Sequence, residues 1–158
     1  MSLKNLNVIK TPKNLISKLS NKRIKNLYKK FEKNFKVKEK FAVAVSWCPD
    51  SLALAFLTKV FALKYKLNTK YFIVDHKLRK ESSKEAKYVQ KILSKIGLRS
   101  KILIWNSKKP LKNIQAVARE NRLRLLIKAC KSINTKNLLI GHHEEDLYEN
   151  FFIRLFRG

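Results

Sequence analysis

The sequence predicts an α/β fold of the doubly wound class, in which helices cover both faces of a mainly parallel sheet. Short, continuously apolar runs recur along the chain, as is typical of strands buried on both faces. The longer segments between them carry apolar residues at helical spacing. The chain has 158 residues, of which 45% are hydrophobic, so it is long enough for one core and too apolar for a disordered polycation. We therefore expect one folded domain.

Residues 1–40 are expected to form a basic helical N-terminal segment ahead of this domain, which would occupy residues 41–158. The segment holds thirteen Lys and Arg against two Glu. Its apolar residues recur at helical spacing, namely Leu15, Ile16, Leu19, Ile24, Leu27 and Phe31. The first strand of the domain is predicted directly after it, at 41–45.

The remaining elements follow from the positions of apolar runs, caps and breakers. Ser82-x-x-Glu85 has the pattern of a capping box at a helix start, and Gly97 is a typical helix stop. Pro110 separates the third strand from a long helix. The expected elements are strands at 41–45, 71–74, 101–105 and 137–140, and helices at 52–66, 82–96, 114–133 and 143–156.

The net charge of +26 points to a polyanionic partner, because few acidic residues interrupt the positive surface. Nucleic acid is favoured over an anionic membrane, since no basic segment is paired with a strongly apolar face. A purely compositional alternative is that A/T-rich codons raised the lysine count without a functional cause.

Membrane insertion and secretion are not expected from this sequence. The longest apolar runs are far shorter than the roughly 20 residues of a membrane span, and no hydrophobic block follows the N-terminus. The two cysteines, Cys48 and Cys130, lack the spacing of a disulfide framework or a zinc site. We expect a reducing, cytoplasmic location.

Residues 46–51 follow the first strand and lead into a helix, where free backbone N–H groups and the helix dipole would favour an anion. In open α/β sheets, ligands bind beyond the carboxyl ends of the strands. A phosphate is therefore the expected ligand of this loop. The alternative is that Asp50 and Ser51 merely cap the helix.

Residues 141–149 form a second candidate site, because four of the eleven acidic residues of the chain lie between positions 144 and 149. His142 and Asp146 would share one helix face. Oxygen ligands beside a phosphate loop suit Mg²⁺ bound to a nucleotide. A zinc-protease motif is excluded, because Leu147 stands where the second histidine is required. The alternative is that the acids simply complement the helix dipole.

Arginine is scarce beside lysine in this chain, and its positions suggest bidentate contacts with phosphate or carboxylate. The first position is Arg79, which follows the second strand together with His76. The others are Arg119 and Arg122 in the long helix, with Arg124 more typical of a solvated face. The aromatic residues, including Tyr71, Tyr88 and Trp105, are interpreted as core rather than as stacking platforms.

Four motifs in order resemble those of the tRNA(Ile)-lysidine synthetases, which are PP-loop (N-type) ATP pyrophosphatases with a Rossmann-like fold. The motifs are Ser-x-x-Pro-Asp-Ser at 46–51, Val-Asp-His-x-Leu-Arg at 74–79, Ala-Arg-x-x-Arg at 118–122, and Gly-His-His-x-x-Asp-x-x-Glu at 141–149 running into Arg-Leu-x-Arg-Gly at 154–158. The resemblance implies an ATP-dependent ligase. The enzyme would adenylate the wobble cytidine of tRNA(Ile) and then attach free L-lysine to give lysidine.

The resemblance also assigns roles to residues of this chain. Asp50 and Asp146 are the implied catalytic residues and the implied Mg²⁺ ligands. The implied ATP-binding loop is Ser46, Trp47, Cys48, Pro49, Asp50 and Ser51. The implied contacts with phosphate or tRNA are His76, Arg79, Arg119, Arg122, His142 and His143. A homo-oligomer is left open.

The sequence departs from the family pattern at Trp47 and Cys48, where the family has two glycines. A side chain in the left-handed region costs roughly 1 to 2 kcal/mol, and an indole is expected to compete with phosphate for space. The chain also stops inside the last motif, which predicts a domain truncated at its C-terminal end. Two alternatives remain: a catalytically impaired tRNA-binding fragment, and a tRNA 2-thiolating PP-loop enzyme, which would need a Cys-x-x-Cys that this sequence lacks.

Overall fold

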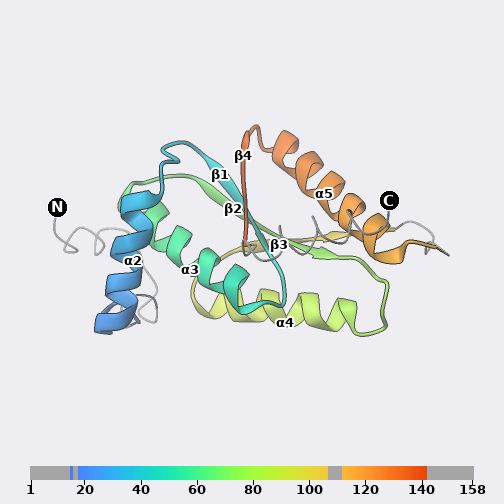
Figure 1. Cartoon of the computed structure of the whole chain (residues 1–158), viewed down its shortest axis with the longest axis horizontal. Helices are drawn as coiled ribbons and strands as arrows, with labels where there is room; N and C mark the ends of the chain where they lie inside the picture. The colour runs from blue at the N-terminus through green and yellow to red at the C-terminus, as the bar shows by residue number, and fades with distance from the viewer. Residues whose placement is uncertain (1–14, 16–17, 107–111, 142–158) are drawn as a thin grey trace, which may run out of the picture.

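The computed structural model describes residue 15 and residues 18–106 and 112–141, and it has the predicted α/β architecture (Figure 1). Its four strands form one parallel sheet in the order β3-β2-β1-β4. Helices α3 and α4 cover one face of the sheet, and α5 covers the other. In chain order the elements are α2 (Lys22–Asn34), β1 (Phe41–Val45), α3 (Pro49–Lys64), β2 (Thr69–Asp75), α4 (Ser82–Lys95), β3 (Ser100–Ile104), α5 (Ile114–Ser132) and β4 (Asn137–Ile140).

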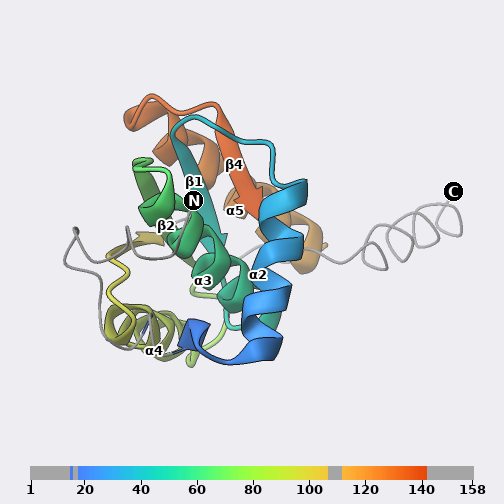
Figure 2. The same cartoon turned by 90° about the vertical axis from the view of Figure 1, so that its left-hand side faces the viewer.

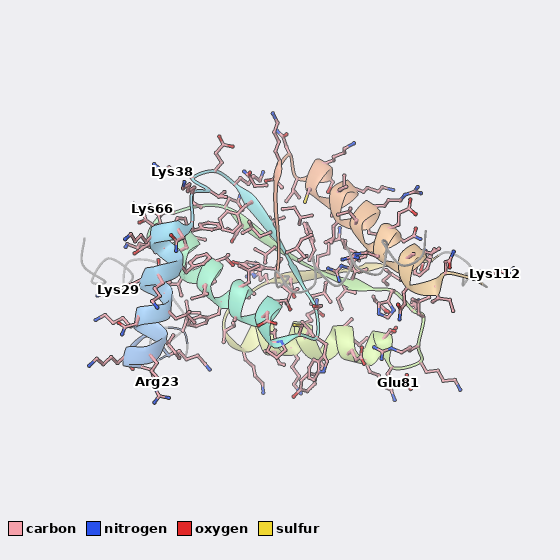
Figure 3. All side chains as sticks on the ribbon, in the orientation of Figure 1. Arg23, Lys29, Lys38, Lys66, Glu81 and Lys112 are labelled. Carbon is pink, nitrogen blue, oxygen red and sulfur yellow. The ribbon has the colours of Figure 1, made fainter. Side chains whose placement is uncertain are left out.

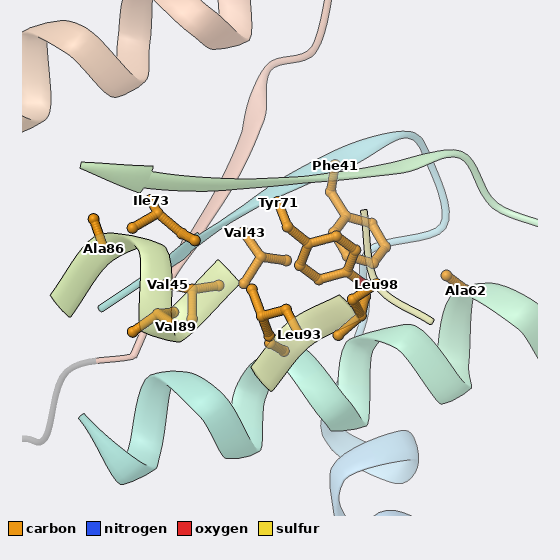
Figure 4. Close-up of a cluster of buried hydrophobic side chains, with 11 residues drawn as sticks. Phe41, Val43, Val45, Ala62, Tyr71, Ile73, Ala86, Val89, Leu93 and Leu98 are labelled. Atoms are coloured by element: carbon orange, nitrogen blue, oxygen red, sulfur yellow. The ribbon is translucent and has the colours of Figure 1, made fainter. Parts of the chain in front are cut away.

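Strand β1 lies in the middle of the sheet and is buried along its whole length. Because successive side chains of a strand point to opposite faces, β1 supplies both layers of the core. Phe41, Val43 and Val45 pack with residues of β2, α3 and α4 (Figure 4). Ala42 and Ala44 face α5 in a second cluster. The continuous apolar run seen in the sequence is therefore explained by helices on both faces.

The predicted strands agree with the structure to within two residues at each end, and 41–45 and 137–140 agree fully. Helix α3 begins at Pro49, three residues before its expected start, because proline fits the first helical position. The expected helix at 143–156 lies outside the described residues. Within the described part of the chain, no helix is both long and apolar enough to cross a membrane.

The predicted capping box at Ser82 is wrong. Glu81 is the N-cap of α4 and makes no side-chain capping bond, while Ser82 is already helical and buried. The Ser82 hydroxyl instead accepts a hydrogen bond from the backbone N–H of Arg79 (3.3 Å) and lies 3.2 Å from Nδ1 of His76. The hydroxyl thus holds the loop after β2 instead of the helix end.

Helix α2 confirms that part of the N-terminal segment is helical. The Asn21 side chain caps it by accepting from the N–H of Arg23 at 2.9 Å. One face of α2 packs on α3 (Figure 2). Aromatic rings dominate this contact, with the centroids of Phe35 and Phe61 4.8 Å apart in an edge-to-face arrangement.

A polar network fixes the register of α2 on α3. The Glu32 carboxylate accepts from the Tyr28 hydroxyl (2.9 Å) and from Nζ of Lys64 (2.6 Å). Burial by itself would raise the pKa of Glu32, but the hydrogen bonds from Lys64 and Tyr28 lower this pKa below its ordinary value of 4.5. Burial, together with the bond to Glu32, raises the pKa of Tyr28. The ionised form of Glu32 therefore stabilises the fold.

We predict that Glu32→Gln lowers the free energy of unfolding by about 1 kcal/mol at pH 7, because a charge-assisted, partly buried pair is lost. A lowered carboxyl pKa stabilises the fold above pH 4.5, and this contribution is lost as the pH falls below that value. Urea unfolding should therefore show a constant difference between the proteins from pH 6 to 8 and a shrinking one from pH 5 to 3. Glu39→Gln, at an exposed carboxylate after α2, is the control. A difference that grows towards pH 3 would contradict the prediction.

Candidate functional site

The strand order places a topological switch point between β1 and β4. The chain passes from β1 through α3 to β2 on one side of the sheet, and from β3 through α5 to β4 on the other. Helices on opposite faces leave a crevice at the carboxyl ends of the two central strands. Residues 46–48 and Gly141 follow those ends, so the structure brings together two loops that lie about ninety positions apart in the sequence.

The loop after β1 opens onto the N-terminus of α3, which is uncapped in the sense that its N-cap residue makes no side-chain capping bond. Cys48 is the N-cap of α3 and makes no side-chain capping bond, and Pro49 has no N–H. The interpretation that Ser51 merely caps the helix is wrong, because its hydroxyl bonds back to Ser46 and to the carbonyl oxygen of Cys48. The role of Asp50 stays a prediction. An uncapped first turn, with the dipole of a 16-residue helix behind it, is suited to an anion.

Ser51 closes this loop instead of capping the helix. Its buried Oγ accepts from the N–H of Ser46 (3.0 Å) and lies 2.9 Å from the carbonyl oxygen of Ser46 and 3.0 Å from that of Cys48. One side chain thus ties the end of β1 to the first turn of α3. These hydrogen bonds stabilise the loop from within.

Gly141 brings the end of β4 against the same turn. A Cβ atom at this position would lie 3.0 Å from both the backbone N and the Cα of Ser51, which is tighter than nine in ten real Cβ contacts. Only glycine fits here without moving backbone. Gly141 was part of a sequence motif but received no role. Its signal is a glycine directly after an apolar strand, in a chain with three glycines.

The expected strain at Trp47 and Cys48 is not found. Cys48 has φ −137° and ψ 135°, and Trp47 is not among the described non-glycine residues with positive φ. The Trp47 indole is 55% exposed and contacts the ring of Tyr88 on α4, so the loop carries both side chains in ordinary backbone conformations.

Tyr88 is 53% exposed, which corrects its interpretation as a core residue, whereas Tyr71 and Trp105 are buried as predicted.

A cavity of about 130 Å³ lies at the carboxyl ends of β1, β2 and β4. It brings together predicted site residues from three separate motifs. Those that line it are Ser46, Trp47, Ser51, His76 and Arg122, together with Gly141. His142, His143 and Asp146 lie outside the described residues.

His76 is oriented by the loop after β2. Its Nδ1 accepts from the backbone N–H of Leu78 (3.4 Å), and the Ser82 hydroxyl lies 3.2 Å from the same atom. Because an N–H only donates, Nδ1 is the acceptor and the ring proton lies on Nε2. Asp75 precedes it and accepts from the Ser83 hydroxyl at 2.6 Å. His76 therefore offers one N–H donor beside the cavity.

The arginines of the site differ in their surroundings. Burial, reinforced by the nearby charge of Arg119, lowers the pKa of Arg122, so an anion beside Arg122 would relieve an unfavourable charge. Arg119 is exposed on the same helix. Arg79 instead pairs with Glu85 at 3.1 Å, and Arg124 pairs with Glu120 at 2.8 Å. Of the four, Arg122 reaches the cavity lining.

The Mg²⁺ ligands remain a prediction. In the part of the chain that the structure describes, no group of three His, Cys, Asp or Glu side chains is placed to hold a metal ion. Asp50 lies in the first turn of α3, where its Oδ2 is 3.4 Å from the Sγ of Cys48. Its expected partner, Asp146, is outside the described residues.

We predict that Gly141→Ala weakens ATP binding at least tenfold and destabilises the fold by about 1 to 3 kcal/mol, because the new methyl group collides with the backbone of Ser51. Calorimetric titration and urea unfolding measure the two effects. Gly97→Ala is the matched control. Gly97 has φ 73°, so alanine there should cost about 1 to 2 kcal/mol of stability and leave ATP affinity unchanged. Equal losses of affinity in both variants would contradict the assignment of Gly141 to the site.

Comparisons with known proteins agree with this geometry. The family model described as a PP-loop domain matches residues 16–158. The chain is 44% identical over 124 residues to the tRNA(Ile)-lysidine synthase of Orientia tsutsugamushi (strain Boryong), covering 78% of this chain and 28% of that protein. It is 36% identical over 137 residues to the tRNA(Ile)-lysidine synthase of Rickettsia bellii (strain OSU 85-389), covering 83% and 32%.

A solved structure has the same fold. The U34-tRNA thiolase NcsA from Methanococcus maripaludis superimposes with a TM-score of 0.74 at 19% identity, covering 85% of this chain and 50% of that one. The chain spans 28 to 32% of the length of the two sequence relatives. The matched family model, the parallel sheet and the loop at its switch point lead to one conclusion: this chain belongs to the PP-loop domain family of ATP-binding proteins.

Proposed function

We propose that this chain is the nucleotide-binding part of a tRNA(Ile)-lysidine synthase. In the proposed reaction the 2-carbonyl oxygen of the wobble cytidine attacks the α-phosphorus of ATP and pyrophosphate leaves. The amine of free L-lysine then attacks C2 of the base, AMP leaves, and the amine proton passes to solvent. The two relatives with this name, at 44% and 36% identity over most of the chain, support the choice.

The observation that carries the proposal is the uncapped first turn of α3, closed by Ser51 and approached by Gly141. Backbone N–H groups at a helix N-terminus are suited to phosphate oxygens. A phosphate chain there needs close approach of backbone, which Gly141 supplies by lacking a side chain. ATP supplies an activated phosphorus and a leaving group. The residues of this chain bind and orient it.

Arg122 and His76 would stabilise charge at the cavity. Arg122 is partly buried, so its interaction with a developing negative charge is stronger than it would be in water. Nε2–H of His76 offers a second donor. We further propose that Asp50 and Asp146 hold Mg²⁺, with His142, His143 and Arg119 contacting phosphate or tRNA.

A tRNA partner accounts for the charge of +26. Basic side chains cover the outer face of α2, where Arg23 and Lys29 point away from the body (Figure 3). Such a surface would neutralise backbone phosphates of a bound tRNA. The two free cysteines fit the cytoplasmic location of tRNA modification.

The thiolation alternative is less well supported. Its structural relative carries a [4Fe-4S] cluster, and such clusters are usually held by cysteine thiolates, commonly four. The present sequence has two cysteines, and Cys130 is buried on the face of α5 that packs against the sheet. The non-enzymatic alternative, a tRNA-binding fragment, makes a different prediction: salt-sensitive RNA binding that is independent of ATP and lysine.

We predict that the chain releases pyrophosphate from ATP in the presence of tRNA(Ile), and that Arg122→Ala lowers kcat/KM at least tenfold through lost charge stabilisation. A coupled pyrophosphate assay measures the rate, and mass spectrometry of the tRNA identifies lysidine. Arg124→Ala, which removes an exposed arginine paired with Glu120 on the same helix, should change the rate less than about twofold. RNA binding without pyrophosphate release would favour the non-enzymatic alternative.

A further inference from the structure

We propose that Trp47 and Tyr88 together form a stacking platform for a nucleobase. The platform lies at the mouth of the cavity at the carboxyl ends of β1, β2 and β4. The proposal rests on the proposed function, which supplies two bases, the adenine of ATP and a base of the RNA. Both sources present the same chemistry, a flat aromatic face attached to phosphate. The Trp47–Tyr88 pair is the recognising surface.

The pair joins two elements that are distant in the sequence. Trp47 comes from the loop after β1, and Tyr88 from the middle of α4. Their ring centroids are 4.8 Å apart with an interplanar angle of 69°, an edge-to-face contact. Such a contact uses the edge of one ring and one face of the other, so further aromatic faces stay open to a third ring.

Both rings remain on the surface, unlike most aromatic residues of the core. Trp47 is 55% exposed and Tyr88 53%, whereas Trp105 is 6% exposed and Tyr71 3%. Helix α4 packs on the sheet through Ala86, Val89 and Leu93, so Tyr88 is not needed for that contact. Two large aromatic side chains placed together in solvent indicate a binding surface.

The position of Trp47 connects this surface to the phosphate site. Trp47 lines the same cavity as Arg122 and as Ser51, and Ser51 lies in the first turn of α3. A nucleotide has a base joined to phosphate, and the structure offers an aromatic surface joined to an anion site. A base on the indole therefore lies within reach of a phosphate held at the helix N-terminus.

Exposed lysines flank Tyr88 along α4, and the nearby carboxylate of Glu85 is paired with Arg79. Lys84 and Lys91 lie one turn before and one turn after it on α4, and both are exposed. Lysines beside an aromatic face suit a nucleic acid, because the base stacks while the adjoining backbone phosphates are neutralised. This combination distinguishes a nucleobase from a neutral apolar ligand.

The test measures affinities of the full chain for three ligands: inorganic pyrophosphate, ATP and an anticodon stem-loop RNA. Trp47→Ala and Tyr88→Ala should each weaken binding of ATP or of the RNA by about 5- to 150-fold, the range expected for a lost base stack. Pyrophosphate has no base, so its affinity should change less than about twofold. Trp47→Phe and Tyr88→Phe keep an aromatic ring and should restore most of the affinity.

The identity of the weakened ligand distinguishes the two sources. Loss for ATP alone assigns the platform to adenine, and loss for the RNA alone assigns it to an RNA base. Fluorescence gives an independent signal, since a Trp105→Phe background leaves Trp47 as the single tryptophan. A stacked base should then shield Trp47 from iodide quenching. Tyr65→Leu removes an exposed ring on the C-terminal side of α3 and should change none of the affinities.

Three outcomes would overturn the platform. The first is that neither alanine variant weakens ATP or RNA binding. The second is that both variants weaken pyrophosphate equally, since the rings would then act by shaping the loop. The third is that the unaltered chain binds none of the three ligands, in which case the proposed function fails and the platform with it. The first two outcomes leave the proposed function intact.

Discussion

The close approach of the end of β4 to the first turn of α3 is the constraint on which the site depends. Strand β1 pairs with β2 on one side and β4 on the other, and its two neighbouring helices lie on opposite faces. The crevice at its carboxyl end is therefore narrow. Gly141 fits against the backbone of Ser51 because it has no side chain, and Ser51 holds the loop that faces it. The order of the strands thus places Gly141 against the first turn of α3, and this contact creates the proposed anion site.

Charge and burial act together at this edge of the sheet. The helix N-terminus and Arg122 both favour a negative ligand, and burial of Arg122 makes that preference stronger. Away from the site, Glu32 has a structural use at the contact of α2 with α3. Positive charge is thus left in excess at the surface, where it is suited to a large polyanion.

Much of the fold could be predicted from the sequence, because strands buried on both faces have a distinctive apolar run. The run at 41–45 indicated both the strand and the loop that follows it. Local patterns were less reliable where tertiary contacts compete with them. Ser82 has the spacing of a capping residue, yet its hydroxyl is used by the loop that carries His76.

The aromatic residues also show that local sequence patterns do not predict tertiary contacts. Tyr88 lies off the face of α4 that packs on the sheet, so it is exposed, and only the fold brings Trp47 near it. The strain expected at Trp47 assumed that a residue in a glycine position keeps the glycine conformation. The loop instead takes an extended conformation at Cys48, with φ −137°. Backbone geometry of this kind is not encoded in residue type alone.

The most direct test of the account is a calorimetric titration of magnesium pyrophosphate into this chain and into a Trp47→Gly, Cys48→Gly double variant. If the loop binds phosphate with its own side chains in place, both proteins should bind with affinities within about threefold of each other. Binding by the double variant alone would show that Trp47 and Cys48 block the site. Binding by neither protein would show that the uncapped turn of α3 is not an anion site.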